Sequence, residues 1–413
     1  MQETKTLEPS PYLDRFVIQD PAVVYLDGNS LGRLAKQTAE RIDQVVGQEW
    51  GNELISSWNR HWLSLGRRLG DKIGLIIGSK PGETIVCDST SINLFKLAWG
   101  LMGQRGNRTK IITDRANFPT DLYILESVAK LSNADIQIEL VDFDDATHQG
   151  VDEKLAERID DSTALVCLSH VQYKSGYAFD MQSVTQKCRS RGVRTLWDLS
   201  HSVGVLPMQL ADWGVDAAVG CTYKYLNGGP GAPAFLYLKS DLHRILENPI
   251  AGWFGAAEPF AFGLDYEPHP RIERFLVGTP PVLSTSAIEP GLDLILEAGL
   301  DWIRERSIAL SEYFIQGFDR SLGALGYRLV TPRDASMRGS HVSVSHPQGW
   351  QITQDLVRGY RVIPDFRGPD VIRLGFAPLY NQACDVERAI DALQASVQSG
   401  SFKDYSPERL GVT

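Results

Sequence analysis

The stretch between residues 195 and 231 constrains the fold of this chain more than any other. It contains two short apolar runs. The first ends at Asp198, with His201 shortly after it, and the second leads directly to Tyr223 and Lys224. Both runs have the length of buried strands closed by polar loops, and ligand-binding groups of open α/β sheets gather at the carboxyl ends of strands. The pattern therefore predicts an α/β sheet with functional side chains at one edge.

Short apolar runs also occur before this stretch, and they alternate with segments that have a helical pattern. The runs include residues 83–88, 110–114 and 164–171. Repeated strand–helix units of this kind predict a mostly parallel sheet that is flanked by helices on both faces.

The C-terminal part of the chain follows a different order. A helical pattern extends from Ala287 to about Leu325, and beyond it the strand candidates lie closer together. A chain of 413 residues is also long for one hydrophobic core, which favours two domains. We therefore expect a large α/β domain over residues 1–300, with the N-terminal segment included, and a smaller C-terminal α+β domain over residues 301–413.

Charge and composition exclude several classes of partner. The formal net charge is −10 and no basic run is sustained, which argues against nucleic acid or an anionic membrane as a main partner. The N-terminal residues lack the basic and apolar regions of a secretory signal, and no apolar run approaches a membrane span. The five cysteines form no CxxC pair, so we expect reduced thiols and no metal site. These features predict a cytoplasmic protein.

An acid and a lysine at neighbouring strand ends suit the chemistry of pyridoxal 5′-phosphate (PLP). Lys224 could hold the aldehyde as a Schiff base, and Asp198 could keep the pyridine nitrogen protonated. Taken singly, each residue is more often a turn cap or a solvated charge. The order of Asp198, His201, the Tyr223–Lys224 pair and a glycine-rich loop is what favours a PLP site.

Three other predicted strand ends carry residues that suit the same cofactor. Thr90 and Ser91 lie where a strand passes into a helix, and free N–H groups there could bind the phosphate as well as simply cap the helix. Phe118, fixed before a proline, could stack on the pyridine ring or belong to the core. Ser169 follows the next strand and could reach a ring substituent.

Arg373 is the candidate for binding a substrate carboxylate. It lies late in a predicted strand of the smaller domain. Arginine binds carboxylates in a bidentate manner, although arginines in ordinary salt bridges are common.

Two other enzyme classes remain open from the residues alone. Ser30 lies in a G-x-S-x-G pattern, and Asp198 and His201 follow in the order of a serine hydrolase, but these two share a single turn instead of coming from separate loops. A cysteine desulfurase would need a mobile cysteine in the C-terminal domain. The late cysteine, Cys384, lies at the start of the last predicted helix, which makes that class a weak alternative.

Taken together, the motifs resemble those of the kynureninases. The matching segments, in chain order, read YLDGNSLG, NFPTD, WDLSHSVG, CTYKYLNGGPG, GWFG and IRLGFAPLYN. The resemblance extends from about Tyr25 to Tyr380, nearly the whole chain. It implies the PLP fold type I architecture and the hydrolysis of L-kynurenine to anthranilate and L-alanine, a reaction of tryptophan catabolism.

The resemblance also implies roles for individual residues. Lys224 would be the Schiff-base lysine, Asp198 the partner of the pyridine nitrogen, and Tyr223 an adjacent proton donor. Arg373 would bind the substrate carboxylate. The cofactor pocket would be formed by Thr90, Ser91, Phe118, Asp121, Ser169, Asp198, His201, Tyr223 and Lys224, together with Trp253 and Thr279 reaching across from a neighbouring subunit of a homodimer.

Two positions depart from many members of that family. Ala256 stands where relatives often have a histidine, and the Gly278-Thr279-Pro280 segment differs from the Ser-Asn-Pro of animal enzymes. The second change falls beside the substrate ring and favours kynurenine over 3-hydroxykynurenine. A relative that acts on a substituted kynurenine would share every motif above.

Overall fold

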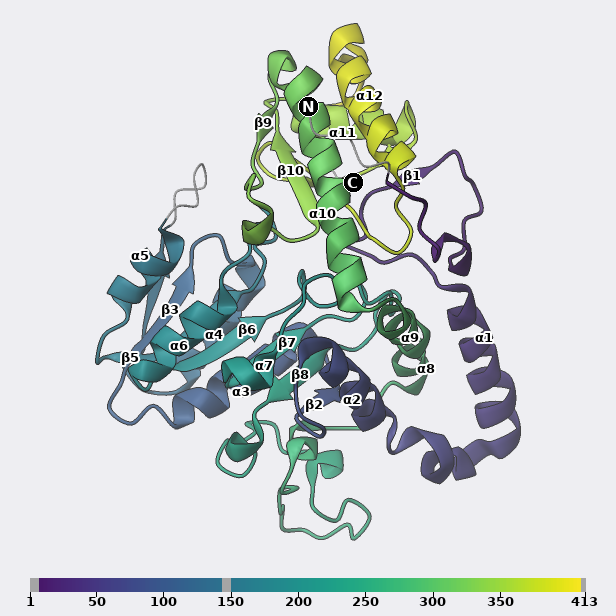
Figure 1. Ribbon diagram of the computed structural model, residues 1–413. Coiled ribbons are helices and arrows are strands. Elements are labelled where there is room, and N and C mark those ends of the chain that lie inside the picture. Colours follow the sequence, from purple (N-terminus) through teal and green to yellow (C-terminus); the bar gives the residue numbers. More distant parts are fainter. Residues whose placement is uncertain (1–6, 143–149, 410–413) are drawn as a thin grey trace.

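The computed structural model describes residues 7–142 and 150–409. Its elements form two lobes: a large one around a seven-stranded sheet and a small one around a four-stranded sheet. Figure 1 shows the small lobe, with α10, α11 and α12, above the large lobe. None of the described helices is both long enough and apolar enough to cross a membrane.

The large sheet has the strand order β2-β8-β7-β6-β5-β3-β4. β8 is antiparallel to both of its neighbours, and all other pairs are parallel. This confirms the predicted mostly parallel α/β sheet. The strands are β2 (Thr84–Val86), β3 (Lys110–Asp114), β4 (Gln137–Val141), β5 (Thr163–Ser169), β6 (Arg194–Asp198), β7 (Ala217–Gly220) and β8 (Phe235–Leu238).

Alternate residues of the central strands face two different hydrophobic cores. In β5, Val166 and Leu168 belong to one core, while Leu165 and Cys167 belong to the other. This period of two is what a strand buried on both faces requires. The first core is covered by α2 (Leu65–Ile77), α6 (Met181–Ser190) and α9 (Glu289–Ala298), and the second by α3 (Thr90–Gly103) and α4 (Pro119–Leu131).

The small lobe contains an antiparallel sheet of order β12-β13-β10-β9. Its apolar residues form a core of their own. This arrangement agrees with the predicted α+β character of the C-terminal part. The strands are β9 (Arg328–Leu329), β10 (His341–Ser345), β12 (Asp365–Arg367) and β13 (Val371–Gly375), and the helices are α10 (Leu300–Gly317), α11 (Gly349–Arg358) and α12 (Ala383–Ser399).

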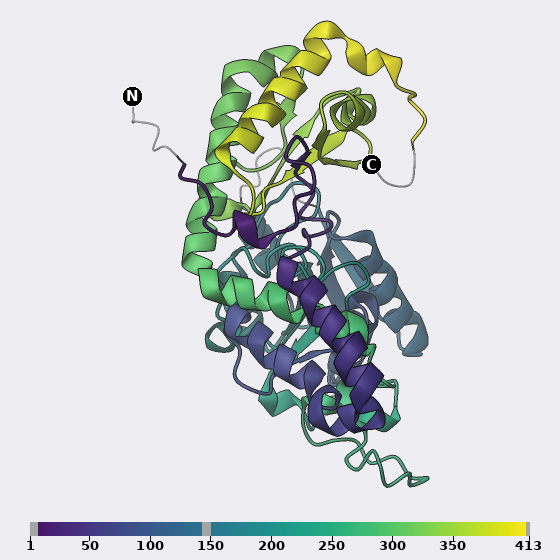
Figure 2. The ribbon, with the colours of Figure 1, turned by 90° about the vertical axis from the view of Figure 1, so that its right-hand side faces the viewer.

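The N-terminal segment belongs physically to the small lobe. β1 (Val24–Tyr25) pairs in parallel with β11 (Val362–Ile363), and Val24 and Leu26 lie in the small-lobe core. Figure 2 shows this segment, in purple, passing the small lobe before α1 (Lys36–Gln44) descends along the large lobe. The domain division at residue 300 stays a prediction.

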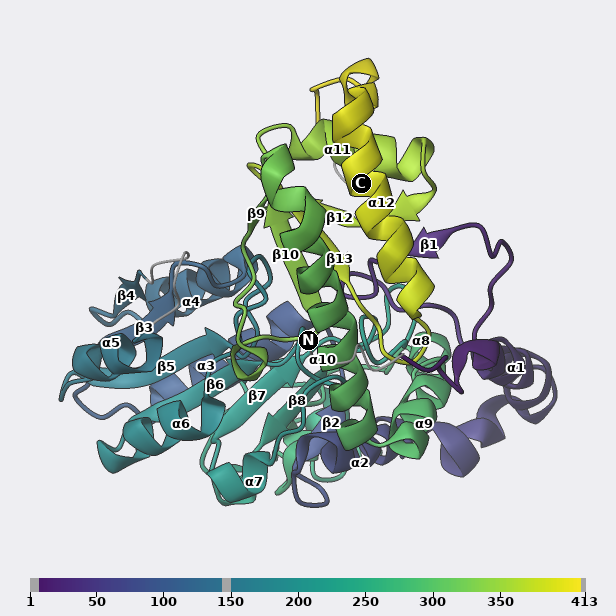
Figure 3. The same cartoon turned by 45° about the horizontal axis from the view of Figure 1, so that its top comes forward.

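The long helical pattern after Ala287 is divided into two helices. Gly299 has a φ of +76°, a conformation that ends α9 and that glycine adopts without strain. α10 then begins and extends from one lobe into the other, because Ile303 lies in the large-lobe core and Phe314 in the small-lobe core. Figure 3 shows α10 as the continuous connection between the lobes. The remaining helices are α5 (Val151–Arg158), α7 (Leu210–Trp213) and α8 (Val282–Ser286).

Candidate functional site

The register of the large sheet brings the predicted polar residues together. Ser169, the last residue of β5, pairs with Asp198, the last residue of β6, and Asp198 in turn pairs with Val219 of β7. The parallel strands end at the same edge of the sheet, and Lys224 follows β7 at that edge. The prediction that functional side chains meet at the carboxyl ends of the strands therefore agrees with the topology.

Lys224 is held in a closely hydrogen-bonded turn. Asn227 N–H donates to the Lys224 carbonyl (2.9 Å), and Gly32 N–H donates to the Tyr223 carbonyl (2.8 Å). A Cβ atom on Gly32 would lie 2.3 Å from the Lys224 carbonyl oxygen, so only glycine fits there. Gly32, the last residue of the Gly28–Gly32 motif, thus supports the turn that contains Lys224.

The Lys224 ammonium nitrogen faces the His201 ring. Lys224 Nζ lies 3.3 Å from His201 Nε2. Burial and the nearby Lys224 charge hold the pKa of His201 well below its usual value. His201 is therefore neutral, and its Nε2 can accept a hydrogen bond from Lys224.

Asp198 is a buried carboxylate with one oxygen occupied. Its Oδ1 accepts hydrogen bonds from Ser200 N (2.8 Å) and Ser200 Oγ (2.6 Å). Burial raises the pKa of Asp198, while the Ser200 hydrogen bond and the Lys224 charge oppose that rise. Within the described residues Oδ2 contacts no donor, so it can bind a ligand N–H.

Asp121 is a second buried carboxylate close to this group. It lies in the first turn of α4, and its Oδ2 is buried without a hydrogen-bond partner among the described residues. Burial and then the Asp198 charge raise the pKa of Asp121 well above its usual value, with Lys224 acting in the opposite direction. The raised pKa favours a proton on Asp121, and a bound cation beside the two acids would favour their ionised forms.

The predicted ring-stacking residue is available to a ligand. Phe118 immediately precedes α4, its side chain is 40% exposed, and its ring meets Tyr173 edge to face at 5.3 Å. Nearby, Ser169 Oγ donates to Asn117 Oδ1 (2.6 Å), so Ser169 is positioned by a neighbour of Phe118.

Thr90 and Ser91 are the first two residues of α3. The helix is capped by Ser89, whose Oγ accepts from Ile92 N–H (3.4 Å). The first N–H groups of a helix have no intrahelical partner, and the helix dipole favours an anion there. Both candidate residues are half-buried and are thus free to contact a phosphate.

Arg373 is fully buried in β13 and is already engaged. Its guanidinium forms an ion pair with Asp365 of β12 and donates hydrogen bonds to the Tyr173 carbonyl (2.6 Å) and to Ser30 Oγ (3.0 Å). Its Nε atom has no partner among the described residues. A substrate carboxylate would therefore compete with Asp365 for this arginine.

Tyr223 keeps its proton in this environment. The nearby Cys221 and then burial raise the pKa of the Tyr223 phenol above its usual value. A phenol with a raised pKa can hold and later donate a proton, although it is a weaker acid than an exposed tyrosine.

Trp253 and Thr279 stand apart from the lysine turn within this chain. Trp253 is 39% exposed and contacts Phe254, Phe260 and Phe262, and Thr279 is exposed. The two segments lie side by side, because Phe254 N–H donates to the Val277 carbonyl (3.3 Å). Within the described residues neither side chain contacts the group around Lys224.

The serine hydrolase alternative has no geometric support. Ser30 Oγ contacts Asp365 (3.2 Å) and Arg373, whereas His201 faces Lys224. Ser30 follows β1, which is paired in the small lobe and not in the large sheet, so it is not at a nucleophile elbow. Cys384 lies in the first turn of α12, on a regular helix instead of a mobile loop.

The residues present fit PLP. A protonated ring nitrogen would bring a hydrogen-bond donor and a positive charge to the two buried acids, Asp198 and Asp121. The aldehyde would react with Lys224. Phe118 offers a flat apolar surface for the ring. Among the described residues, no group of three or more potential metal ligands is gathered in one place.

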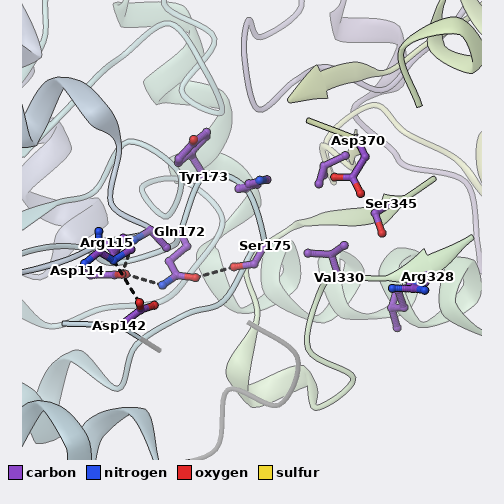
Figure 4. Close-up of a pocket in the computed structure, with 14 residues that line it drawn as sticks. Asp114, Arg115, Asp142, Gln172, Tyr173, Ser175, Arg328, Val330, Ser345 and Asp370 are labelled. Carbon is purple, nitrogen blue, oxygen red and sulfur yellow. Dashed lines mark hydrogen bonds and ion pairs between the residues drawn. The ribbon is translucent and has the colours of Figure 1, made fainter. Parts of the chain in front are cut away.

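A cavity of about 470 Å³ lies beside this group, between the two lobes. Figure 4 shows Gln172 joining Asp114 to Ser175 on one wall, with Arg328 and Asp370 on the other. None of the predicted cofactor residues lines this cavity. Its link to the site is Tyr173, which also contacts Phe118.

Several residues of the site had no local signal in the sequence. Asn117 and Ser200 orient Ser169 and Asp198, and Asp365 holds Arg373. The first two adjoin predicted residues and could have been found by asking which neighbours orient them. Asp365 could be found only once the pairing of β12 with β13 is known, because that register places it opposite Arg373.

Solved structures with similar folds include two cysteine desulfurases. A cysteine desulfurase from Thermococcus onnurineus has a TM-score of 0.82 at 19% identity, and covers 95% of this chain and 100% of its own. A cysteine desulfurase from Escherichia coli has a TM-score of 0.81 at 17% identity, with coverages of 94% and 98%. At these identities the similarity establishes the fold alone, PLP fold type I.

Sequence comparison identifies closer relatives. A family model described as the kynureninase C-terminal domain matches residues 303–393. A kynureninase from Burkholderia pseudomallei is 43% identical over 95% of this chain and 94% of its own length. A kynureninase from Pseudomonas fluorescens is 41% identical over 93% of this chain and 91% of its own. Because this identity extends over nearly the full length of both chains, the chain belongs to the kynureninase family.

Proposed function

We propose that this protein hydrolyses L-kynurenine to anthranilate and L-alanine with PLP as its cofactor. The observation that carries the proposal is the arrangement of Lys224 next to neutral His201 and buried Asp198 at the carboxyl edge of the large sheet. Family membership supports the same reaction class, a PLP-dependent hydrolysis of a carbon–carbon bond.

PLP bound through Lys224 would supply an electron-poor ring that accepts the electron pair left at the substrate α-carbon. Asp198 holds a proton at the ring nitrogen through its unoccupied Oδ2. The Lys224 amine would take the proton from the substrate α-carbon. His201 serves this step because its neutral Nε2 keeps the lysine amine in place by accepting a hydrogen bond.

The phosphate and ring of the cofactor have separate supports. The N–H groups and hydroxyls of Thr90 and Ser91 would hold the phosphate at the start of α3, and Phe118 would offer its face to the ring. Ser169, oriented by Asn117, would provide a further polar contact.

Arg373 binds the substrate α-carboxylate. Its guanidinium is already buried and oriented by the Tyr173 carbonyl and Ser30, so little side-chain freedom is lost on binding. The carboxylate replaces part of the Asp365 contact. A water molecule supplies the oxygen with which the aromatic ketone becomes the anthranilate carboxylate as the carbon–carbon bond breaks. Tyr223, which keeps its proton, would donate it to the alanine fragment.

The functional protein is a homodimer with two shared sites. Trp253 and Thr279 are exposed and lie away from Lys224 of their own chain, which supports a role at the site of a second copy. The aromatic group around Trp253 includes Phe260 and Phe262, which are 55% and 73% exposed. Such apolar surface is expected to be covered in an assembly.

Mass spectrometry after borohydride reduction tests the cofactor. In protein supplied with PLP, a pyridoxyl group should be found on Lys224 and on no other lysine. Absence of that group from the wild-type protein would contradict the proposal.

A parallel assay tests the substrate. We expect turnover of kynurenine with formation of anthranilate and alanine, slower turnover of 3-hydroxykynurenine, and none of cysteine. Faster turnover of the hydroxylated substrate would reverse the ring preference that we assign to the segment around Thr279. Release of sulfide from cysteine would favour a desulfurase instead.

A further inference from the structure

Lys96 is an unusual residue for the interior of a helix. It lies in the middle of α3, and its side chain is 0% exposed. Burial of an ammonium group is costly unless the charge is paired and its N–H groups are hydrogen bonded. Both conditions are met: Lys96 Nζ forms an ion pair with Asp88 and donates to the Phe275 carbonyl at 2.6 Å.

The first of these partners belongs to the loop that leads into α3. Asp88 has a φ of +46°, a left-handed conformation that is uncommon for a residue with a side chain. The helix itself holds the residues on either side: Asn93 Nδ2 donates to the Cys87 carbonyl (2.8 Å), and Ile92 N–H donates to Ser89 Oγ (3.4 Å). Lys96 supplies the corresponding anchor for Asp88.

The second partner belongs to the segment that carries Thr279. Phe275 ends a short helical turn, Ile272–Phe275, and Thr279 follows four residues later on exposed backbone. Lys96 therefore connects the loop before α3 with a segment that lies 179 residues after Lys96 in the chain. One segment presents Thr90 and Ser91, and the other presents Thr279.

We propose that Lys96 is a positioning residue for the cofactor phosphate. It does not contact the phosphate itself but holds in place the two segments whose residues do. The inference rests on the proposed function and extends it. Through Asp88 it sets the direction of the first N–H groups of α3 in its own subunit. Through Phe275 it sets the position of Thr279, whose hydroxyl is offered to the second subunit.

An ordinary core lysine would have a different signature. It would stabilise the protein equally with and without cofactor, and its loss would leave the affinity for phosphate unchanged. A positioning residue instead affects the ligand-bound form more than the free form. The test therefore compares ligand affinity, not activity alone.

The variant Lys96→Met keeps the length and apolar stem of the side chain and removes the charge. The Asp88 side chain is 30% exposed, so its carboxylate can turn to water after the change. We expect the dissociation constant for PLP, measured by equilibrium dialysis on the apoenzyme, to rise about tenfold or more, the loss typical of one charge-assisted contact. The variant Lys239→Met, which removes a lysine that is ion-paired with Asp241, should leave this dissociation constant unchanged.

Inorganic phosphate gives a second readout that needs neither aldehyde nor turnover. Phosphate should raise the melting temperature of the wild-type apoenzyme and raise that of Lys96→Met by clearly less. Equal shifts, together with wild-type affinity for PLP, would overturn the inference.

The two proposals fail in different ways. If the wild-type protein traps no pyridoxyl group on Lys224, the proposed function fails and this inference fails with it. If wild-type and Lys96→Met both trap the group and bind PLP equally well, only the role of Lys96 is refuted. Should Lys96→Met not fold, Asp88→Asn removes the same ion pair from the exposed side; weaker PLP binding in that variant supports the role, and unchanged binding refutes it.

Discussion

The two ends of the candidate site are constructed differently. The lysine end, formed by Asp121, Asp198, His201 and Lys224, is held by the strand register of the large sheet and by backbone hydrogen bonds around the lysine turn. The arginine end, formed by Ser30, Asp365 and Arg373, is held mainly by side-chain contacts within the small lobe, with one hydrogen bond to the large lobe through the Tyr173 carbonyl. Asp27 belongs to the same end, because the charges of Asp365 and Arg373 act on its carboxyl group.

This difference separates two kinds of catalytic work. Backbone-supported groups stay in place during the reaction, as proton transfer and electron withdrawal require. An ion pair between side chains can be exchanged for a contact with the substrate, as binding requires. Changes at the lysine end should therefore act on kcat, and changes at the arginine end on KM.

The largest effect is expected at the lysine end. Lys224→Ala removes the amine that holds the cofactor and moves the α-proton, so kcat should fall at least about a thousandfold. The yellow absorbance of the bound cofactor should be altered, while circular dichroism should show a folded protein. Lys239→Ala, at the surface, is the matched control. Retained turnover would show that another group performs both roles.

Asp198→Asn should have the next largest effect. The amide keeps the size of the side chain but cannot hold a proton at the ring nitrogen, so kcat should fall about a hundredfold while PLP stays bound. Steady-state kinetics and dialysis measure the two quantities separately. A change in KM alone would mean that the lysine end also binds substrate, and the comparison would then fail.

Arg373→Met tests the other side of the comparison. Loss of a charge-assisted contact with the substrate carboxylate should raise KM for kynurenine roughly 10–100-fold, with a smaller change in kcat. Substrate titration of the initial rate gives both values. If kcat falls and KM stays constant, Arg373 takes part in the chemical step and not in binding.

Asp365→Asn tests the arginine end in a second way and should have a smaller effect on KM. The amide oxygen can still accept a hydrogen bond from Arg373, but the competing negative charge is gone, so KM should fall a few-fold, about what one weakened ionic contact gives. The same change removes the carboxylate that is ion-paired with a buried guanidinium and should lower the melting temperature. An increase in KM would show that Asp365 is needed chiefly to orient the arginine.

The pH dependence of binding should show the smallest effect. Burial and then the Asp365 charge raise the pKa of Asp27 to about 6, against the favourable effects of Ser30, Arg373 and Arg367. Because the raised pKa means that the folded protein prefers protonated Asp27, ionisation above pH 6 adds a second anion near Arg373 and should weaken substrate binding. KM should rise about two- to threefold between pH 5.5 and 7.5 in the wild type.

The Asp27→Asn variant provides the comparison for that profile. Its KM should be nearly constant over the same range, because position 27 no longer titrates. Stability should change in the same direction. The folded protein binds the Asp27 proton more tightly than the unfolded chain, so Asp27 stabilises the fold most at a pH below its unfolded-state pKa, and this contribution is lost as the pH rises through about 6. Chemical denaturation at pH 4 and pH 7.5 should therefore differ less in the variant than in the wild type.

The lysine end could be predicted from the sequence more fully than the arginine end. Asp198, His201 and Lys224 lie on strand ends, and parallel strand ends meet whenever the alternating pattern is present. Local pattern and topology therefore sufficed for the lysine end and for the mostly parallel sheet.

The arginine end depends on pairings that no local pattern contains. β1 joins β11 across more than 330 residues, and Asp365 faces Arg373 through the register of β12 and β13. The break at Gly299 was also missed, since a single glycine within a helical pattern can be either tolerated or a terminus. Individual roles at both ends stay predictions until the variants are measured.

The hydrogen bond from Gly32 N–H to the Tyr223 carbonyl has a mechanical consequence. Gly32 lies on the loop after β1, which is tethered to the small lobe, and Tyr223 adjoins the lysine of the large lobe. A movement of one lobe relative to the other would therefore displace the peptide group next to Lys224. The peptide contact that links the two segments at this point requires a residue without a side chain at position 32.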